Sequence, residues 1–255
     1  MRKEIKTFLS YFLLFGLACL SRPGLKGNER KEEIANFTLD WDGKILLLMA
    51  NGEFLIRVDT NLLSCETIVL PQRIFQPKKV LANFSYLFLS NSSHLFIFER
   101  KDRQFQKIFS FGEINDWTLS PFGEIFLLKR GERNLIRIDQ FFNTKTFPSP
   151  IDPSSQSLTF FGGELAILNP KKKEIIFYNP LGVRLGHLPL PEENLQFSPN
   201  AKEEVCLFSS SGNIWTIKGK AVSFFQNFGR IKSCLPGAYS FFILTPENQI
   251  RKIPK

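Results

Sequence analysis

The chain has 255 residues, of which 43% are hydrophobic and 22% are charged, and its formal net charge at pH 7 is +9. This balance is typical of an ordinary globular protein and excludes a disordered chain. The sequence contains only two histidines, so few imidazoles are present for metal binding or proton transfer.

The first residues predict an export signal. Arg2, Lys3 and Lys6 are basic, residues 8–17 are apolar, and Ala18 is a suitable cleavage position. The apolar run is far shorter than the roughly 20 residues that span a bilayer. We expect residues 1–18 to be a signal peptide, 19–30 a polar tether and 31–255 the folded domain, in the periplasm or the outer cell envelope.

Residues 16–19 read Gly-Leu-Ala-Cys and resemble the lipobox of bacterial lipoproteins, which implies a lipid on Cys19 and a membrane tether. The match is incomplete, because Gly16 stands where Leu is usual and Leu17 where a small residue is usual. Ordinary secretion with an unmodified Cys19 is the alternative. The other cysteines have no Cys-x-x-Cys spacing, which argues against a metal site. We expect them to be buried free thiols, with a Cys206–Cys234 bridge as the alternative: Cys65, Cys206 and Cys234.

Along the chain, one unit recurs six times. Its clearest copy is residues 117–139: an apolar strand, a Pro-Phe-Gly turn, a second strand, a charged turn and a third strand. The turn between the first two strands recurs every 36 to 42 residues, with these second members: Gly43, Ser85, Gly123, Gly163, Ala201 and Gly237. The next turn keeps the same spacing.

An outer strand follows most third strands, for example at 66–70, 105–109, 183–188 and 222–226. Four short antiparallel strands in about 40 residues form one blade of a β-propeller. The sequence therefore predicts an all-β fold, a six-bladed β-propeller of four-stranded blades. The chain ends after the third strand of the sixth unit, so we expect residues 26–33 to complete the last blade; a three-stranded last blade is the alternative.

The Gly-Glu-Ile of residues 123–125 and the Asn-Leu-Ile-Arg-Ile-Asp of residues 134–139 carry a resemblance to the NHL and TolB-like six-bladed propellers. The resemblance covers about residues 37–253. It implies a fold and does not imply one function.

The innermost strands predict a polar channel without reactive groups. Aligning them on their turns places small or neutral side chains in one column: Thr38, Thr118, Thr159, Gln196 and Ser233. Asp40 is the only carboxylate in the next column. A metal site or a general acid/base pair needs more than one such group, so we expect no metal and no cofactor. The acidic metal cluster of propeller lactonases has no counterpart.

The turns between second and third strands and the links between units predict a basic face if they lie together: Arg73, Lys78, Lys79, Arg130, Arg133, Lys171, Lys172 and Lys173. Such a face favours an anionic partner. Aromatic residues that could stack on bases are sparse there, which argues against nucleic acid. The leading hypothesis is a non-enzymatic, exported protein-interaction scaffold in the cell envelope. The alternative is a small-ligand-binding or hydrolytic, lactonase-like propeller with a site built from loops.

Overall fold

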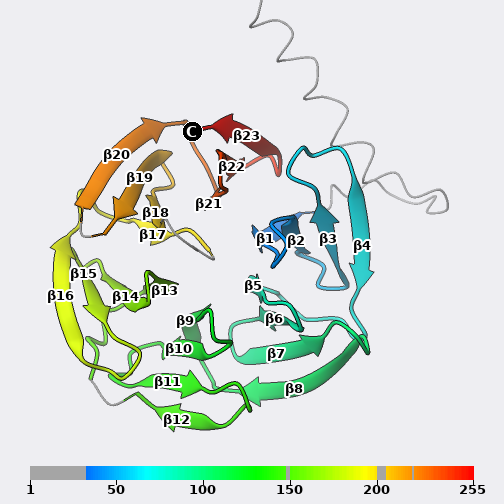
Figure 1. Cartoon of the computed structure of the whole chain (residues 1–255), viewed down its shortest axis with the longest axis horizontal. Helices are drawn as coiled ribbons and strands as arrows, with labels where there is room; N and C mark the ends of the chain where they lie inside the picture. Colours follow the sequence, from blue (N-terminus) through cyan, green and yellow to red (C-terminus); the bar gives the residue numbers. More distant parts are fainter. Residues whose placement is uncertain (1–32, 148–149, 200–204, 220) are drawn as a thin grey trace, which may run out of the picture.

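The protein is a six-bladed β-propeller (Figure 1). The computed structural model describes residues 33–147, 150–199, 205–219 and 221–255. Each blade is an antiparallel sheet whose strands follow one another outward from the axis in sequence order. The predicted all-β propeller is confirmed.

The first three blades contain twelve strands. Blade 1 has β1 (Ile34–Leu39), β2 (Ile45–Met49), β3 (Phe54–Val58) and β4 (Cys65–Val69). Blade 2 has β5 (Lys79–Ala82), β6 (Tyr86–Ser90), β7 (His94–Glu99) and β8 (Gln104–Ser110). Blade 3 has β9 (Ile114–Leu119), β10 (Ile125–Lys129), β11 (Leu135–Ile138) and β12 (Thr144–Thr146).

The other three blades contain eleven strands. Blade 4 has β13 (Ser157–Phe161), β14 (Glu164–Asn169), β15 (Glu174–Tyr178) and β16 (Arg184–Pro189). Blade 5 has β17 (Gln196–Phe197), β18 (Val205–Phe208), β19 (Asn213–Lys218) and β20 (Ala221–Asn227). Blade 6 has β21 (Ser233–Pro236), β22 (Ser240–Leu244) and β23 (Ile250–Pro254).

The sixth blade has three strands among the described residues. Of the segment expected to complete it, residues 26–32 lie outside the described residues. Glu33 is described, and its carbonyl oxygen accepts a hydrogen bond from the Ala50 amide at 2.7 Å. Glu33 therefore extends the innermost strand of blade 1 and is not part of an outer strand of blade 6.

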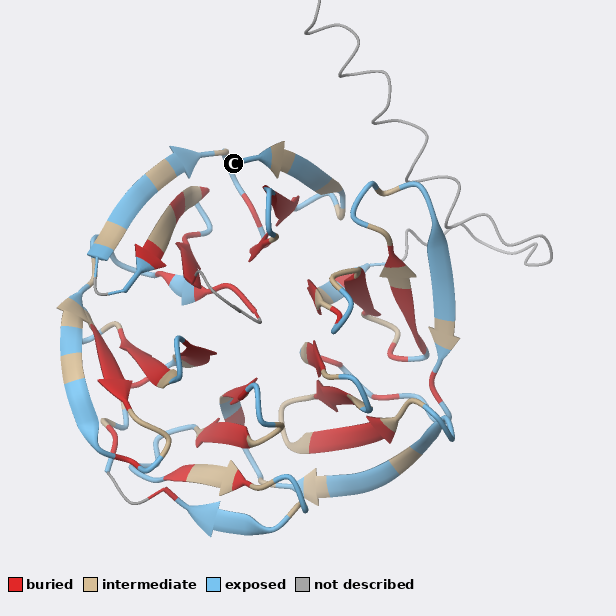
Figure 2. Cartoon of the chain, in the orientation of Figure 1, coloured by how far each residue is buried: buried red, intermediate tan, exposed pale blue. Residues whose placement is uncertain are grey.

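The core consists of six apolar clusters, one at each junction between neighbouring blades. Strand β2 shows how one blade serves two junctions. Ile45 and Leu47 pack toward blade 6, while Leu46 and Leu48 pack toward blade 2, because successive side chains of a strand point to opposite faces. Figure 2 shows the burial concentrated in the inner strands, with the outer strands β4, β8, β16 and β20 mostly exposed.

The antiparallel order separates the connections between two faces of the disc. The turns from second to third strands and the links between blades lie on one face, here named the link face. The turns from first to second and from third to fourth strands lie on the opposite face, here named the far face. On the link face, Gly52 has φ +69°, and a Cβ there would stand 1.8 Å from the Ile74 carbonyl oxygen. Only glycine lets this link pack against its turn.

Two phenylalanines of blade 3 provide a matched test of the junction packing. Phe126 is fully buried at the junction with blade 4, and Phe122 is 73% exposed on the far face. Phe126→Ala should lower the free energy of unfolding by about 3–5 kcal/mol, because it leaves a cavity between blades. Phe122→Ala should change it by less than about 0.5 kcal/mol. Urea unfolding followed by circular dichroism measures both, and equal effects would contradict the junction packing.

Candidate functional site

A cavity of about 560 Å³ lies at the link-face mouth of the central channel. Residues from all six blades line it, since the first strand of each blade begins here. Its wall is polar, with amide and hydroxyl side chains such as Asn36, Gln156 and Gln196. Five basic side chains stand around it: Lys78, Lys79, Arg130, Lys171 and Lys232.

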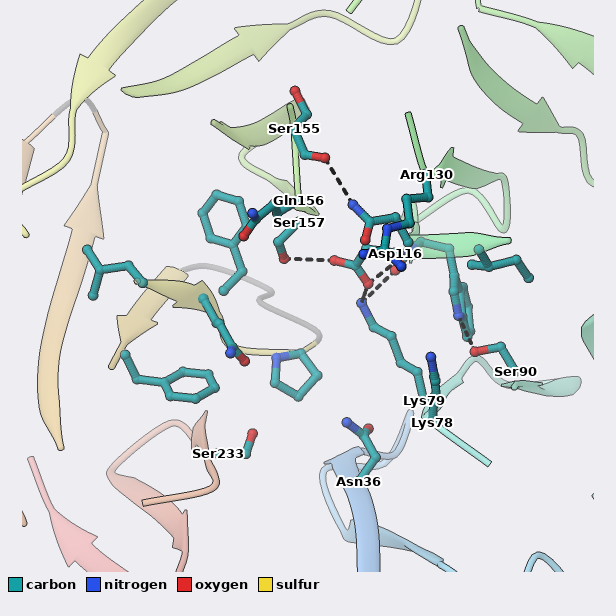
Figure 3. A pocket seen from close by; sticks show the side chains of 18 of the residues that line it. Asn36, Lys78, Lys79, Ser90, Asp116, Arg130, Ser155, Gln156, Ser157 and Ser233 are labelled. Carbon is teal, nitrogen blue, oxygen red and sulfur yellow. Dashed lines mark hydrogen bonds and ion pairs between the residues drawn. The ribbon is translucent and has the colours of Figure 1, made fainter. Parts of the chain in front are cut away.

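Among the described residues, Asp116 is the one acidic side chain that lines this cavity, and protein donors occupy both of its oxygens (Figure 3). Oδ1 accepts hydrogen bonds from Lys79 Nζ at 2.7 Å and from the Trp117 amide at 2.8 Å. Oδ2 accepts from Ser157 Oγ at 2.7 Å and from the Leu158 amide at 2.9 Å. Asp116 therefore joins blade 3 to blades 2 and 4, and it is not a free general base.

Lys79 is held in the same network. Its ammonium also donates to the Trp117 carbonyl oxygen at 2.6 Å, and its side chain is 16% exposed. Trp117 in turn donates from Nε1 to Ser90 Oγ at 2.7 Å. The predicted partner residue Lys79 is thus a structural cation, fixed between blades 2 and 3.

The lysines of the run 171–173 differ in their partners. Lys172 Nζ lies 2.9 Å from Asp152 Oδ2, and Lys173 Nζ lies 2.5 Å from Glu193 Oε1. Hydrogen bonds from Ser154 and Lys172 hold the pKa of Asp152 well below its usual range. The hydrogen bond from Lys173 lowers the pKa of Glu193. Lys171 is exposed, lines the cavity and makes no ion pair within the described part of the chain.

The other predicted basic residues lie on the link face as expected from the strand order. Lys78 and Arg133 are exposed and, like Lys171, form no ion pair with a described residue. Arg130 Nη1 lies 2.7 Å from Glu113 Oε1, with both side chains exposed, and such surface pairs contribute little free energy. Arg73 Nε donates to the Asn51 carbonyl oxygen at 3.0 Å.

The predicted channel-lining residues divide into two groups. Gln196 and Ser233 line the cavity. The expectation of water-facing side chains is wrong for Thr38, Thr118 and Thr159, which are at most 3% exposed. The innermost strand is the edge of its sheet, so its backbone faces the axis while its side chains alternate toward the two neighbouring blades. Asp40 is also fully buried.

The alignment of the innermost strands did not include Asp116. It stands two residues before Thr118 and therefore points to the same face of β9, one step nearer the link face. Extending the aligned column by one step would have placed Asn36, Lys78, Asp116 and Ser157 together at the mouth.

The cysteines depart from the expected pattern at one position. Cys206 and Cys234 are buried free thiols, as predicted, and the alternative bridge between them is absent. Cys65 is exposed at the start of β4 and is disulfide-bonded, so the expectation of a buried free thiol is wrong there. Cys65 lies at the start of the outer strand of blade 1, which is mostly exposed, so its sulfur is not buried.

Among the described residues, no group of three or more His, Cys, Asp and Glu side chains is placed to hold a metal ion. The described part of the chain also contains no helix long and apolar enough to cross a membrane.

No protein-family model and no curated protein matches this sequence. Solved structures do. Virginiamycin B lyase from Staphylococcus aureus matches with a TM-score of 0.65 at 11% identity, over 90% of this chain and 83% of the lyase. A histidine-to-alanine variant of that lyase, solved with quinupristin, is catalytically inactive.

PorZ, a bacterial surface component of the type-IX secretion system of Porphyromonas gingivalis, matches with a TM-score of 0.65 at 11% identity, over 87% of this chain and 31% of PorZ. YCF48 bound to D1 peptide matches with a TM-score of 0.61 at 12% identity, over 91% of this chain and 80% of the YCF48 chain. At these identities the similarity shows the propeller fold alone.

The Asp116 network predicts a stability effect. Asp116→Asn removes the charge that pairs with the largely buried Lys79 and weakens the bonds to blade 4. The free energy of unfolding should fall by about 2–3 kcal/mol, because a buried cation is left without its anion. Asp102→Asn, at an exposed far-face turn, is the control and should stay within about 0.5 kcal/mol of the unmodified protein. Urea unfolding measures both, and an unchanged Asp116→Asn variant would contradict the proposed role.

The depressed pKa of Asp152 predicts acid sensitivity. A carboxylate whose folded-state pKa lies below its unfolded value of about 3.9 stabilises the protein above that pH, and the contribution is lost as the pH falls toward the folded pKa. Asp152→Asn should therefore be less stable than the unmodified protein near neutral pH, and the difference should shrink below about pH 4.

Thermal unfolding at a series of pH values measures this difference. Ser154→Ala removes the strongest donor to Asp152 and should lose a large part of the same pH-dependent stabilisation. Parallel curves for Asp152→Asn and the unmodified protein would show that the carboxylate makes no such contribution.

Proposed function

We propose that this chain is a non-enzymatic, NHL- or TolB-like propeller that binds an anionic region of a protein partner at its link face. The observation that carries this proposal is the channel mouth. Lys78 and Lys171 stand beside it without ion pairs to described residues, while Asp116, the one carboxylate among its described lining residues, is saturated by protein donors. Unpaired cations around a polar cavity favour anionic groups and speed their approach.

A binding role fits the chemistry of the site better than a catalytic one. The lyase with the same fold loses activity when one histidine is replaced. In this chain, neither His94 nor His187 is among the residues that line the mouth cavity. YCF48, with the same fold, was solved bound to a peptide. These comparisons support a protein partner for this propeller.

One observation favours a second candidate function, a small-ligand-binding or hydrolytic propeller. A volume of about 560 Å³ lies in the range of small-molecule pockets. This candidate requires a divalent cation at about one per chain or turnover of a small ester. Elemental analysis of the purified protein and an ester-hydrolysis assay separate it from the binding role.

We also propose export to the periplasm or the outer cell envelope, with residues 1–18 as the signal. The basic residues Arg2, Lys3 and Lys6 followed by the apolar run 8–17 support this proposal. Lipidation would tether the domain through Cys19, whereas an unmodified Cys19 would leave a thiol that can pair with another cysteine. The mass of the mature N-terminal peptide, measured with and without reduction, distinguishes a lipid adduct from a disulfide.

Charge reversal at the mouth tests the binding proposal. Lys78→Glu with Lys171→Glu should reduce partner capture from envelope extracts by about tenfold or more, because repulsion replaces attraction. Capture by the unmodified protein should also weaken as salt rises from about 0.05 to 0.5 M. Quantitative mass spectrometry of the captured proteins is the measurement.

The control carries the same change in charge at two exposed lysines away from the link face, Lys101→Glu with Lys145→Glu. It should capture the partner as the unmodified protein does. Equal losses in both double variants, or none in either, would exclude the mouth as the binding site.

A further inference from the structure

A second cavity, of about 350 Å³, lies between blades 1 and 2 on the far-face side. Strands β3 and β4 form one wall, and β6, β7 and the turn after β7 form the other. Leu87 and Phe98 are buried apolar side chains at its wall, and Trp41 stands beside it with 44% of its surface exposed. The cavity is therefore a cleft with an apolar side and an aromatic edge.

A buried carboxylate fixes two arginines in the wall of this cleft. Asp40 is fully buried and accepts hydrogen bonds from Arg57 Nε at 2.8 Å, from Arg100 Nη1 at 3.1 Å and also from Arg100 Nη2. Arg57 has further acidic partners, Asp42 at 2.5 Å and Glu66 at 3.3 Å. The carboxylates near the cleft are therefore already engaged with Arg57 and Arg100.

One cationic group at the cleft retains donors for a ligand. Arg103 is exposed at the rim and forms no ion pair with any residue that the structure describes. Arg100 Nε also has no hydrogen-bond partner among the described residues, but it is buried and closed to a ligand. A guanidinium forms strong, charge-assisted hydrogen bonds with a carboxylate, so Arg103 favours an acidic ligand.

The surface around the cleft is apolar. Trp41 packs edge-on against Phe84, with ring centroids 5.0 Å apart, and Phe84 is 72% exposed. Of the thirteen large apolar side chains exposed in the described residues, eight lie in far-face turns: Trp41, Leu63, Phe84, Phe122, Phe141, Leu181, Val183 and Tyr239. The link face has Phe75. Of the far-face side chains, Trp41 lines the cleft and Phe84 packs against it, so an exposed aromatic pair borders the cleft.

We propose that the cleft between blades 1 and 2 binds an acidic peptide segment that carries an apolar anchor side chain. The anchor packs against the exposed Trp41 ring and Val69, and an adjacent carboxylate accepts hydrogen bonds from Arg103. Tryptophan and arginine around a desolvated pocket are the side chains that dominate protein-interface energetics. This site is on the opposite face from the channel mouth, so the two proposals stand or fall separately.

Tryptophan fluorescence provides a direct readout, because Trp41 is exposed while Trp117 is 1% exposed and Trp215 is partly buried. The probe is an acetylated heptapeptide, Glu-Asp-Leu-Glu-Phe-Asp-Glu, titrated into the full chain and checked by calorimetry. Its binding at the cleft should change the Trp41 emission saturably, and Trp41 does not line the channel mouth. Peptides with Lys in place of the acids, or with Ser in place of Leu and Phe, should bind at least about tenfold more weakly.

Arg103→Glu should reduce the affinity for the acidic peptide by about tenfold or more, since it places a carboxylate at the rim. Lys145→Glu makes the same charge change at an exposed position on β12, away from both the cleft and the channel mouth, and should leave the affinity unchanged. Circular dichroism verifies that both variants are folded.

Three outcomes would overturn the proposal: equal affinity in Arg103→Glu, equal binding of all three peptides, or loss of binding in Lys145→Glu. Self-association of the chain that Phe84→Ser abolishes would also overturn it, because a second copy would then cover this face. Binding to zwitterionic vesicles that Phe84→Ser abolishes, without peptide binding, would assign the face to a membrane.

Discussion

The packing of each blade against two neighbours is the constraint on which this structure depends. The second strands are apolar along both faces, as in β2 and β10. A blade without a neighbour on one side would therefore expose a row of apolar side chains to water. Closing the disc removes every such face. Blade 6 and blade 1 make the last junction through a cluster that includes Ile34, Leu235 and Phe242, together with the ion pair between Lys232 and Glu33 at 2.8 Å.

Closure also determines what the protein can do chemically. It brings six strand starts to one mouth and places lysines from blades 2 and 4 on either side of a polar cavity. Asp116 then stabilises the ring by joining three blades, and these bonds occupy the one carboxylate that lines the mouth in the described part of the chain. The same geometry on the far face puts Asp40 between two arginines and leaves Arg103 without an ion pair among described residues. At both sites the acidic side chains form ion pairs within the protein, whereas some basic side chains form no ion pair with a described residue.

Repeat spacing and strand alternation were enough to predict the six blades and the strand order, because turns such as Gly43 and Gly123 carry a strong local signal. The polar strand Thr144–Thr146 was not predicted, since its three residues are exposed and lack an apolar alternation. The burial of Thr38, Thr118 and Thr159 was also missed, because it depends on how neighbouring blades pack. Ion pairs such as Lys79 with Asp116 join residues from different blades, and the sequence gives no direct measure of such distances.

Native-state hydrogen exchange tests the closed ring most directly. A closed ring predicts that amides of β2 in blade 1 and β22 in blade 6 exchange with the same opening free energy as amides of β10 and β14, within about 1 kcal/mol, because all six junctions open together. If the amides of blades 1 and 6 instead exchanged at an opening free energy several kcal/mol below those of blades 3 and 4, the junction between the first and last blades would not close the ring, and the account would be wrong.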